Sequence, residues 1–185
     1  NADNLVYGKY TYVESDAPEG YQRDDTVYDF SIEEDGQTVR HTREDIRIPG
    51  SIAVFKTDAS GNPLSGVTYE LDYSTDGGRT WKPVYGRSGD DVTEGGCTSS
   101  GLSNGQLITS QDGVAKFEGL RADGRIQYKL TETATRSGYS LLKDPVYKGT
   151  LPVDGDSDPI YEITFTVRES VITGLPTTGS RSFAV

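Results

Sequence analysis

Alternation of apolar and polar residues recurs along the chain and constrains its fold more than any other feature. Successive side chains of a β-strand point to opposite faces, so a period of two predicts strands with one buried face. Turn sequences such as Asp35-Gly36, Asp76-Gly77-Gly78 and Asp112-Gly113 separate the alternating runs. Because no segment has a helical period with caps, the sequence predicts an all-β sandwich. The alternating positions are Tyr10, Tyr12, Tyr28, Phe30, Ile32, Ile52, Val54, Tyr69, Leu71, Tyr73, Ala115, Phe117, Ile126, Tyr128, Leu130, Tyr161, Ile163, Phe165 and Val167.

The charge balance excludes two classes of partner. The chain has 185 residues, of which 18 are basic and 29 acidic, for a formal net charge of −11. A surface this negative repels nucleic acid and anionic membranes. No apolar run is long enough to span a membrane, and neither a signal peptide nor a single Met is present. We therefore expect a mature or trimmed piece of a longer protein.

Few residues are available for metal or nucleophile chemistry. Cys97 and His41 are the single cysteine and histidine, so a Cys/His zinc site is excluded by count, and a catalytic pair would require these two residues to meet. Asp154, Asp156 and Asp158 have calcium-like spacing, but Phe165 occupies the twelfth position, where an EF-hand loop has Glu. We favour a solvated turn over a weak metal site, expect no cofactor, and assign no catalysis on an external substrate.

An internal repeat determines the expected domain organisation. Tyr10–Glu14 and Gly20-Tyr21 align with Tyr128–Glu132 and Gly138-Tyr139 at an offset of 118 residues, and Asp25–Tyr28 aligns with Asp144–Tyr147 one residue out of phase. The first copy has no counterpart of the strands between Ser51 and Phe117. The repeat predicts that residues 1–49 are the C-terminal half of one domain and residues 50–172 a complete second one. Half a sandwich cannot bury its own apolar face, so partner strands are expected upstream in a longer protein.

The complete domain contains two local sequence patterns that predict loop or turn structure. Residues 84–110, and above all Ser88–Ser110, are rich in Gly, Ser and Thr and are predicted to be a long looped insertion. Ser74–Trp81 spells Ser-x-Asp-x-Gly-x-Thr-Trp, the pattern of an Asp-box hairpin. A single copy favours a structural hairpin, with carbohydrate contact through Trp81 as the less favoured alternative.

Three strings together carry a resemblance to a known family. They are Ile52-Ala-Val-Phe-Lys-Thr-Asp58, Tyr128-Lys-Leu-Thr-Glu-Thr133 and Leu175-Pro-Thr-Thr-Gly179, and the first copy adds Glu14-Ser-Asp-Ala-Pro-Glu-Gly-Tyr21. The chain resembles the Cna B-type (prealbumin-like, SpaA-type) β-sandwich domains of Gram-positive surface proteins and pilins. The resemblance implies a non-enzymatic, extracellular and cell-wall-anchored protein.

Residues 173–185 resemble a truncated sortase sorting signal. Leu175, Pro176, Thr177, Thr178 and Gly179 spell the recognition motif, and Pro176 with the flanking glycines favours an extended, accessible linker. By resemblance, sortase cuts after Thr178 and transfers it to peptidoglycan precursor or to another pilin subunit. The implied partners are sortase and these acceptors.

Lys56 falls on the core face of its strand. Lys56 is two residues after Val54 and four after Ile52, so its side chain points to the same face of the strand as theirs. The exposed face is then expected to carry Ala53, Phe55 and Thr57. The same parity turns Glu132 inward, and continuing the last strand turns Glu169 inward. A buried Lys beside buried carboxylates is costly unless the charges are satisfied.

The resemblance offers a role for these residues. In the family, such a Lys joins an Asn or Asp of the last strand in an isopeptide bond, assisted by a Glu. Here Glu169 takes the acceptor position, with one extra methylene. A Lys56–Glu169 bond, an unbonded ion cluster of Lys56, Glu132 and Glu169, and a Lys56 that extends to solvent all remain open. In the first copy, Glu14 matches the assisting Glu, and Asp45 is a possible acceptor on spacing alone.

Two functions follow as expectations. The first is a structural, sortase-attached surface protein, either a basal or anchoring pilin or an adhesin stalk. The alternative is an adhesive module that binds a host matrix protein or glycan through residues 74–110.

Overall fold

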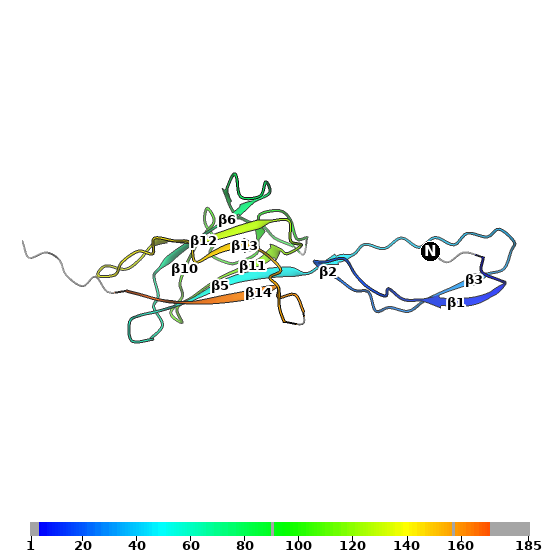
Figure 1. The fold of residues 1–185 in the computed structure, drawn as a ribbon, viewed down its shortest axis with the longest axis horizontal. Helices are drawn as coiled ribbons and strands as arrows, with labels where there is room; N and C mark the ends of the chain where they lie inside the picture. The colour runs from blue at the N-terminus through cyan, green and yellow to red at the C-terminus, as the bar shows by residue number, and fades with distance from the viewer. Residues whose placement is uncertain (1–3, 90, 157, 171–185) are drawn as a thin grey trace, which may run out of the picture.

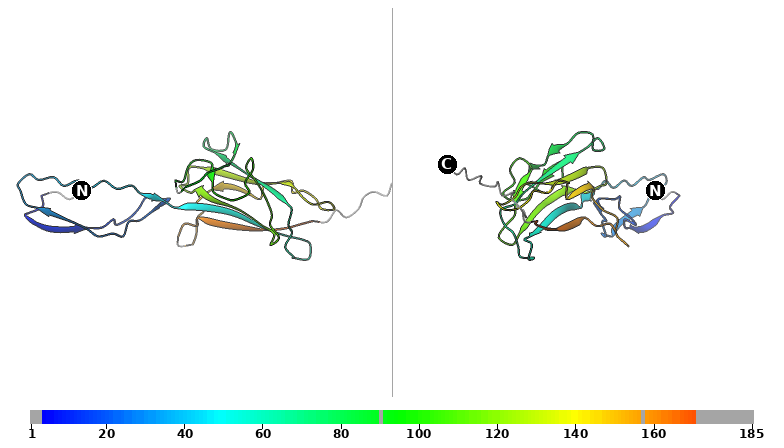
Figure 2. Two further views of the ribbon diagram at one scale, coloured as in Figure 1. Left: turned by 180° about the vertical axis from the view of Figure 1, so that it is seen from behind. Right: turned by 60° about the vertical axis from the view of Figure 1, so that its left-hand side comes forward.

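The computed structural model describes residues 4–89, 91–156 and 158–170, and every regular element in these ranges is a β-strand. Figures 1 and 2 show two parts of different shape: a β-sandwich, and a long, narrow ribbon made by residues 4–48. The predicted all-β fold is therefore confirmed. In the part described, no helix is long and apolar enough to cross a membrane.

Two sheets face each other in the sandwich (Figure 1). The first contains β10 (Gln106–Ile108), β6 (Thr68–Ser74), β12 (Gln127–Ala134) and β13 (Tyr147–Thr150) in that order, with β7 (Lys82–Pro83) also paired to β6. The second contains β11 (Val114–Arg121), β5 (Pro49–Thr57) and β14 (Glu162–Arg168) in that order. β14 runs parallel to β5, whereas the other pairs within the two sheets are antiparallel. A short parallel pair, β8 (Tyr85–Gly86) and β9 (Gly96–Cys97), completes the sandwich.

The core lies between the two sheets and is built from the alternating positions of four strands. Each of these side chains is at most 3% exposed: Ile52, Val54, Tyr69, Leu71, Ala115, Phe117, Tyr128 and Leu130. Their alternation puts the polar residues between them on the outer faces, so the hydrophobic effect fixes which face of each strand points inward.

The outer face of β5 differs from the prediction. Strand alternation predicted that Ala53 and Thr57 would be exposed. This prediction is wrong, because the two residues are only 4% and 5% exposed. β5 is the central strand of its sheet, and longer side chains from both neighbours cover its short ones. The Lys116 Nζ on β11, opposite Ala53, lies 3.5 Å from the Glu162 Oε2 on β14, opposite Ser51, so this ion pair crosses the outer face of β5 at these two residues.

The segment predicted to be a long loop, residues 88–110 within the insertion 84–110, contributes to the core instead. Val84, Cys97 and Leu107 are 1%, 0% and 7% exposed, and β9 and β10 lie within this segment. Glycines with positive φ interrupt it at several places. Most of the segment is turn and loop, as expected, and the two strands within it are too short to show a period of two, so no sequence pattern indicated its buried residues.

The ribbon is a single layer of paired strands. β1 (Gly8–Tyr12) pairs antiparallel with β3 (Tyr28–Ile32), and β2 (Tyr21–Gln22) pairs with β4 (Ile46–Arg47) where the ribbon meets the sandwich. Its aromatic side chains pack on one another. The rings of Tyr10 and Phe30 stack with 5.3 Å between centroids, and those of Tyr12 and Tyr28 with 5.1 Å.

A buried glycine joins the ribbon to the sandwich. Gly20 has φ +84°, and a Cβ there would lie 2.6 Å from the Ala122 carbonyl oxygen, so only glycine allows this approach. The Ile48 N–H donates to the Gly20 carbonyl at 2.8 Å. The Arg47 guanidinium lies 3.1 Å from the Asp123 carboxylate and fixes the same junction.

Candidate functional site: a buried lysine between two carboxylates

Three ionisable side chains converge inside the sandwich, at the end away from the ribbon. Lys56 lies near the end of β5, two residues beyond Val54 on the inward face. Glu132 comes from β12 in the opposite sheet. Glu169 directly follows β14, where its N–H donates to the Thr57 carbonyl at 2.8 Å and continues the pairing with β5. Strand alternation and the parallel register of β5 and β14 thus bring all three together.

The three groups are in direct contact. The Lys56 Nζ lies 2.7 Å from the Glu132 Oε2 and 2.7 Å from the Glu169 Oε2, and all three side chains are 0% exposed. Lys56 therefore does not extend to solvent. The distance to Glu169 also means that the extra methylene of this residue does not keep its carboxyl from the amine.

Two hydroxyl groups complete the site, and sequence reasoning missed both. The Tyr69 hydroxyl donates to the Glu132 Oε2 at 2.9 Å, and the Thr135 hydroxyl to the Glu169 Oε2 at 3.1 Å. The alternation in β6 already turned Tyr69 inward, but no sequence signal pointed to Thr135. A register irregularity between Glu132 and Ala134 precedes it in β12.

The electrostatics of the site are unbalanced. Two carboxyl groups face one ammonium group, and the second oxygen of each carboxyl, Oε1 of Glu132 and of Glu169, is buried without a hydrogen-bond partner in the described residues. Burial, followed by the negative charge of Glu132, raises the pKa of Tyr69 far above its ordinary value, so its hydroxyl stays protonated and donates. Chemically, the arrangement can clamp the two sheets by ion pairing, and it also holds an amine against a carboxyl group.

The first-copy counterparts lie on the ribbon. Glu14 is half-buried, and its Oε2 accepts the Asp24 N–H at 2.7 Å. Asp45 is exposed, immediately before β4. The structure therefore does not bring either residue to Lys56.

Several other candidates lie apart from this cluster. Cys97 is buried in the sandwich while His41 is exposed on the ribbon, so the two do not form a catalytic pair. Among the described residues, no three His, Cys, Asp or Glu side chains are grouped to hold a metal ion. Asp154, Asp156 and Asp158 are all exposed. The motif of Leu175, Pro176, Thr177, Thr178 and Gly179 lies outside the described residues.

The Asp-box segment forms a tight turn between β6 and β7. The Asp76 carboxylate accepts the N–H groups of Arg79 and Thr80 at 2.9 Å each, and the Ser74 hydroxyl at 2.7 Å. These hydrogen bonds, with that of the Thr80 hydroxyl as the largest cause, hold the pKa of Asp76 well below its usual range. The Trp81 Nε1 donates to the Gly78 carbonyl at 3.0 Å and closes the turn.

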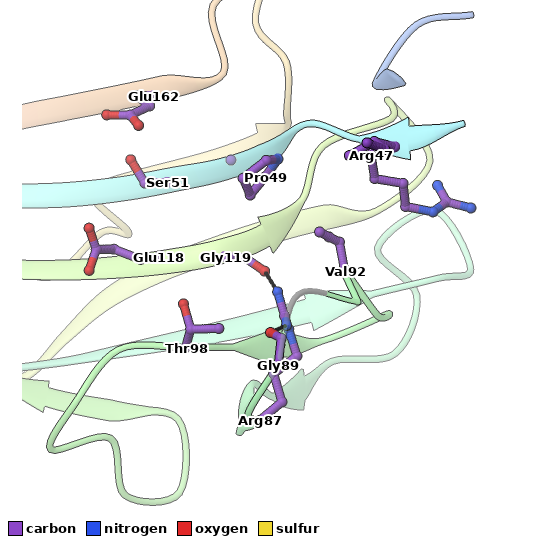
Figure 3. A pocket seen from close by; sticks show the side chains of 12 residues that line it. Arg47, Pro49, Ser51, Arg87, Gly89, Val92, Thr98, Glu118, Gly119 and Glu162 are labelled. Carbon is purple, nitrogen blue, oxygen red and sulfur yellow. Dashed lines mark hydrogen bonds between the residues drawn. The ribbon is translucent and has the colours of Figure 1, made fainter. Parts of the chain in front are cut away.

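A hollow of about 460 Å³ lies between the start of β5 and the β8–β9 region (Figure 3). The Arg87 guanidinium donates to the carbonyl groups of Gly89 and Gly119 at 2.6 and 2.8 Å. Arg47, Glu118 and Glu162 also line the hollow, so its charge is mixed. Arg87 is used to fix a loop, and the hollow supplies no group for chemistry.

Comparisons with known proteins agree with this fold. The sequence profile of the family described as SpaA, prealbumin-like fold domain, matches residues 1–46 and 50–173. The structure of the Bacillus anthracis TIE protein is 23% identical with a TM-score of 0.56, covering 90% of this chain and 25% of that chain. GBS52, the minor pilin of Streptococcus agalactiae, is 20% identical with a TM-score of 0.46, covering 97% of this chain and 66% of that one.

A third similar structure is the Corynebacterium diphtheriae major pilin SpaA, 20% identical with a TM-score of 0.46, covering 82% of this chain and 40% of the pilin. The chain thus spans between about a quarter and two thirds of the length of these three structures. No curated protein sequence matches it. Because the family profile covers most of the chain, in two consecutive matches, the chain belongs to the SpaA prealbumin-like fold domain family.

Proposed function

We propose that this chain is a structural segment of a Gram-positive surface protein, a pilin or adhesin stalk, attached covalently by sortase through Leu175–Gly179. Family membership supports a surface structural role. The motif supports anchoring, because it stands soon after the last strand of the sandwich, β14, in a stretch rich in Gly, Pro, Ser and Thr. In this proposal, sortase cleaves between Thr178 and Gly179 and transfers Thr178 to an amine of peptidoglycan or of another pilin subunit.

The observation that carries the stalk role is the path of the chain through the sandwich. The chain enters from the ribbon into β5 and leaves toward the sorting motif from β14. These strands are adjacent and parallel, so a pull on the two ends of the chain loads their shared hydrogen bonds in shear. Lys56 and Glu169 contact each other at the end of this strand pair, where a link between them ties the two load-bearing strands directly.

In the proposal, this link is covalent. A neutral Lys56 amine attacks the Glu169 carboxyl carbon, the Nζ–Cδ bond forms, and one carboxyl oxygen leaves as water. Glu132 takes the proton lost by Nζ and returns one to the departing oxygen. The 2.7 Å contact, complete burial and the surplus carboxyl group support this chemistry. It acts only on the protein itself, so the chain is not an enzyme in the ordinary sense.

Sortase transfer is the test of anchoring. Incubating the protein with a pilus sortase or a wall-anchoring sortase, and with triglycine as the amine, is expected to give a product whose residue Thr178 carries the triglycine. The Leu175→Ala variant is the matched control and should stay intact. If neither sortase cleaves the protein while both cleave a control peptide, the anchoring proposal is wrong.

The adhesive alternative has one observation in its favour. Trp81 is partly exposed, and the ammonium groups of Lys129 and Lys148 lie 4.8 and 5.5 Å from its ring centroid, although the Lys129 Nζ is also paired with the Asp72 carboxylate at 2.9 Å. Deleting residues 84–110 cannot test it, because that segment contributes core strands. The Trp81→Ala variant is the better probe. Binding to an immobilised matrix glycoprotein that the variant loses would favour adhesion through this face.

A further inference from the structure

β14 is an edge strand, paired with β5 on one side only (Figure 1). At its start, the Tyr161 carbonyl accepts the Ser51 N–H at 2.9 Å, and just after its end the Glu169 N–H donates to the Thr57 carbonyl at 2.8 Å. Alternate residues of a strand bond to opposite neighbours, so the odd-numbered residues from 161 to 169 face β5. The even-numbered residues direct their backbone N–H and C=O groups to the free edge, and among the described residues nothing bonds to these groups.

The other edges of the sandwich are covered or short. Along β11, the Thr98 N–H donates to the Glu118 carbonyl at 2.9 Å, and the Ser99 hydroxyl accepts the Glu118 N–H at 2.8 Å. β13, β10 and β7 are only four, three and two residues long. β14 is seven residues long, contains neither Gly nor Pro, and has no register shift. Proteins usually protect such an edge, so its exposure here points to a partner strand.

The sequence of β14 is complementary to itself. It reads Glu-Ile-Thr-Phe-Thr-Val-Arg from residue 162 to residue 168. If a second copy runs antiparallel beside it with the two Phe165 residues opposite each other, Glu162 lies opposite Arg168. Ile163 then lies opposite Val167, and the two threonines lie opposite each other. Opposite charges at both ends, with β-branched pairs between them, favour this register.

The same register also satisfies the backbone. It places even-numbered residues opposite even-numbered residues, and these are the residues whose N–H and C=O groups point to the free edge. Facing residues of this kind exchange both backbone hydrogen bonds in an antiparallel pair. Charge pairing and backbone pairing therefore select one and the same alignment.

The charged ends of the edge are available on its outer face. Glu162 and Arg168 are both exposed. The Glu162 carboxylate lies 3.5 Å from the Lys116 Nζ, yet its side chain remains 69% exposed. Within the described residues, no carboxylate forms an ion pair with Arg168.

The inner face offers apolar surface to a second strand. Ile163, Phe165 and Val167 are only half-buried, although they pack against the core. A second hollow, of about 450 Å³, lies between residues 142–146 and the C-terminal half of β14. In the antiparallel register, Ile163 of the second copy lies opposite Val167, beside this hollow.

We propose that the chain forms a symmetric dimer in which β14 of one copy pairs antiparallel with β14 of a second copy, centred on Phe165. The two sheets then join into one, in the order β11-β5-β14-β14-β5-β11. The pairing is a closed two-fold contact, because each copy presents the same edge. One strand pair is a small interface, so the dimer should be reversible and half-formed at a concentration on the order of 10–100 μM.

The pairing also sets the direction of the two copies. Because the paired strands are antiparallel, the two chains leave the joined sheet toward their sorting motifs at opposite ends. In a stalk anchored as proposed above, the contact joins stalks that run in opposite directions. The dimer itself does not depend on anchoring or on a Lys56–Glu169 bond.

Exchange of the two charges tests the register. Glu162→Arg and Arg168→Glu each create two like-charged pairs, so each variant should dimerise at least about tenfold more weakly in sedimentation velocity. An equimolar mixture of the two variants should associate again, because each then meets opposite charges in the other. The measurements are made at about 0.15 M salt, which screens the repulsion between two acidic chains.

Glu118→Arg is the matched control for these variants. It makes the same charge change on the other edge strand of the sheet, and Glu118 is likewise paired with Lys116, at 3.0 Å. This variant should dimerise like the unmodified chain. If the mixture of Glu162→Arg and Arg168→Glu does not associate, or if Glu118→Arg weakens the dimer equally, the proposed register is wrong.

The backbone and the centre of the pair are tested separately. Thr164→Pro removes an N–H that points to the free edge, so the melting temperature should stay nearly unchanged while the dimer is lost. Phe165 alone lies opposite itself, so Phe165→Cys should cross-link under mild oxidation, whereas Thr164→Cys should not. The native Cys97 is buried. A chain that stays monomeric up to about 1 mM, or a dimer that Thr164→Pro leaves intact, would overturn the proposal.

Discussion

Lys56 and Glu169 lie at the ends of two adjacent parallel strands, and 2.7 Å separates the Lys56 Nζ from the Glu169 Oε2. β5 and β14 are the one parallel pair within the two described sheets of the sandwich, and both strands lead directly to the ends of the domain. The pair of side chains therefore lies where a covalent or ionic link has most effect on a chain under tension.

The first prediction concerns the mass of the purified protein. Condensation of Lys56 with Glu169 removes one water, so the intact mass should fall below the sequence mass by that amount. The Lys56→Met and Glu169→Gln variants cannot lose water in this way. A Glu132→Gln variant should keep the full mass too, because no carboxyl group remains beside the pair to carry protons. Full mass for the unmodified protein would mean that the cluster is ionic.

The second prediction is the cost of removing the buried cation. If the mass shows that the cluster is ionic, Lys56→Ala leaves two buried carboxyl groups without a cation, and this should lower the free energy of unfolding by about 3–5 kcal/mol. The measurement is equilibrium denaturation in urea. Lys116→Ala is the matched control, since its ion pairs involve side chains that are 37–69% exposed and should contribute less than about 1 kcal/mol. Equal losses for both variants would contradict a special role for Lys56.

The third prediction is a pH dependence caused by Tyr69. Its pKa is raised in the folded protein above its ordinary value of 10.0, so the unfolded chain loses this proton first. The contribution of Tyr69 to the free energy of unfolding is therefore complete below pH 10. Above pH 10 it declines by about 1.4 kcal/mol per pH unit, as expected for one such group. Tyr69→Phe should therefore flatten the fall in unfolding free energy between pH 10 and 11.

At neutral pH, the same variant should lose about 1–3 kcal/mol, because a buried Glu132 oxygen loses its donor. Thermal denaturation at several pH values measures both effects. An unchanged slope above pH 10 would mean that Tyr69 is accessible to solvent.

The fourth prediction concerns the turn between β6 and β7. Asp76→Ala removes the acceptor of the Arg79 and Thr80 amides, so hydrogen exchange should accelerate at residues 79–80. Because the pKa of Asp76 is lowered, these hydrogen bonds persist above its ordinary pKa of 3.8 and weaken only as the pH falls below it. The neighbouring Thr75 is exposed, which makes Thr75→Ala a suitable control with unchanged exchange. Unchanged exchange in Asp76→Ala would show that the backbone holds the turn without the carboxylate.

Much of the fold could be predicted because strand alternation is local. The inward face of β5 and β12 follows from the positions of Ile52, Val54, Tyr128 and Leu130, and the sandwich has these faces. The same periodicity failed for residues 88–110, whose strands are two and three residues long. It also failed for Ala53, whose burial depends on the length of side chains in neighbouring strands.

The sequence by itself determined that Lys56 and Glu132 point inward, since parity is a property of each strand alone. Only the tertiary structure decided that Lys56 meets both Glu132 and Glu169, since this depends on the parallel register of β5 and β14 and on the level at which β12 crosses them. Thr135 joins them after an irregularity in β12 that no local pattern encodes. Register between strands far apart in the chain is set by packing of the whole core, and a sequence read one strand at a time does not contain it.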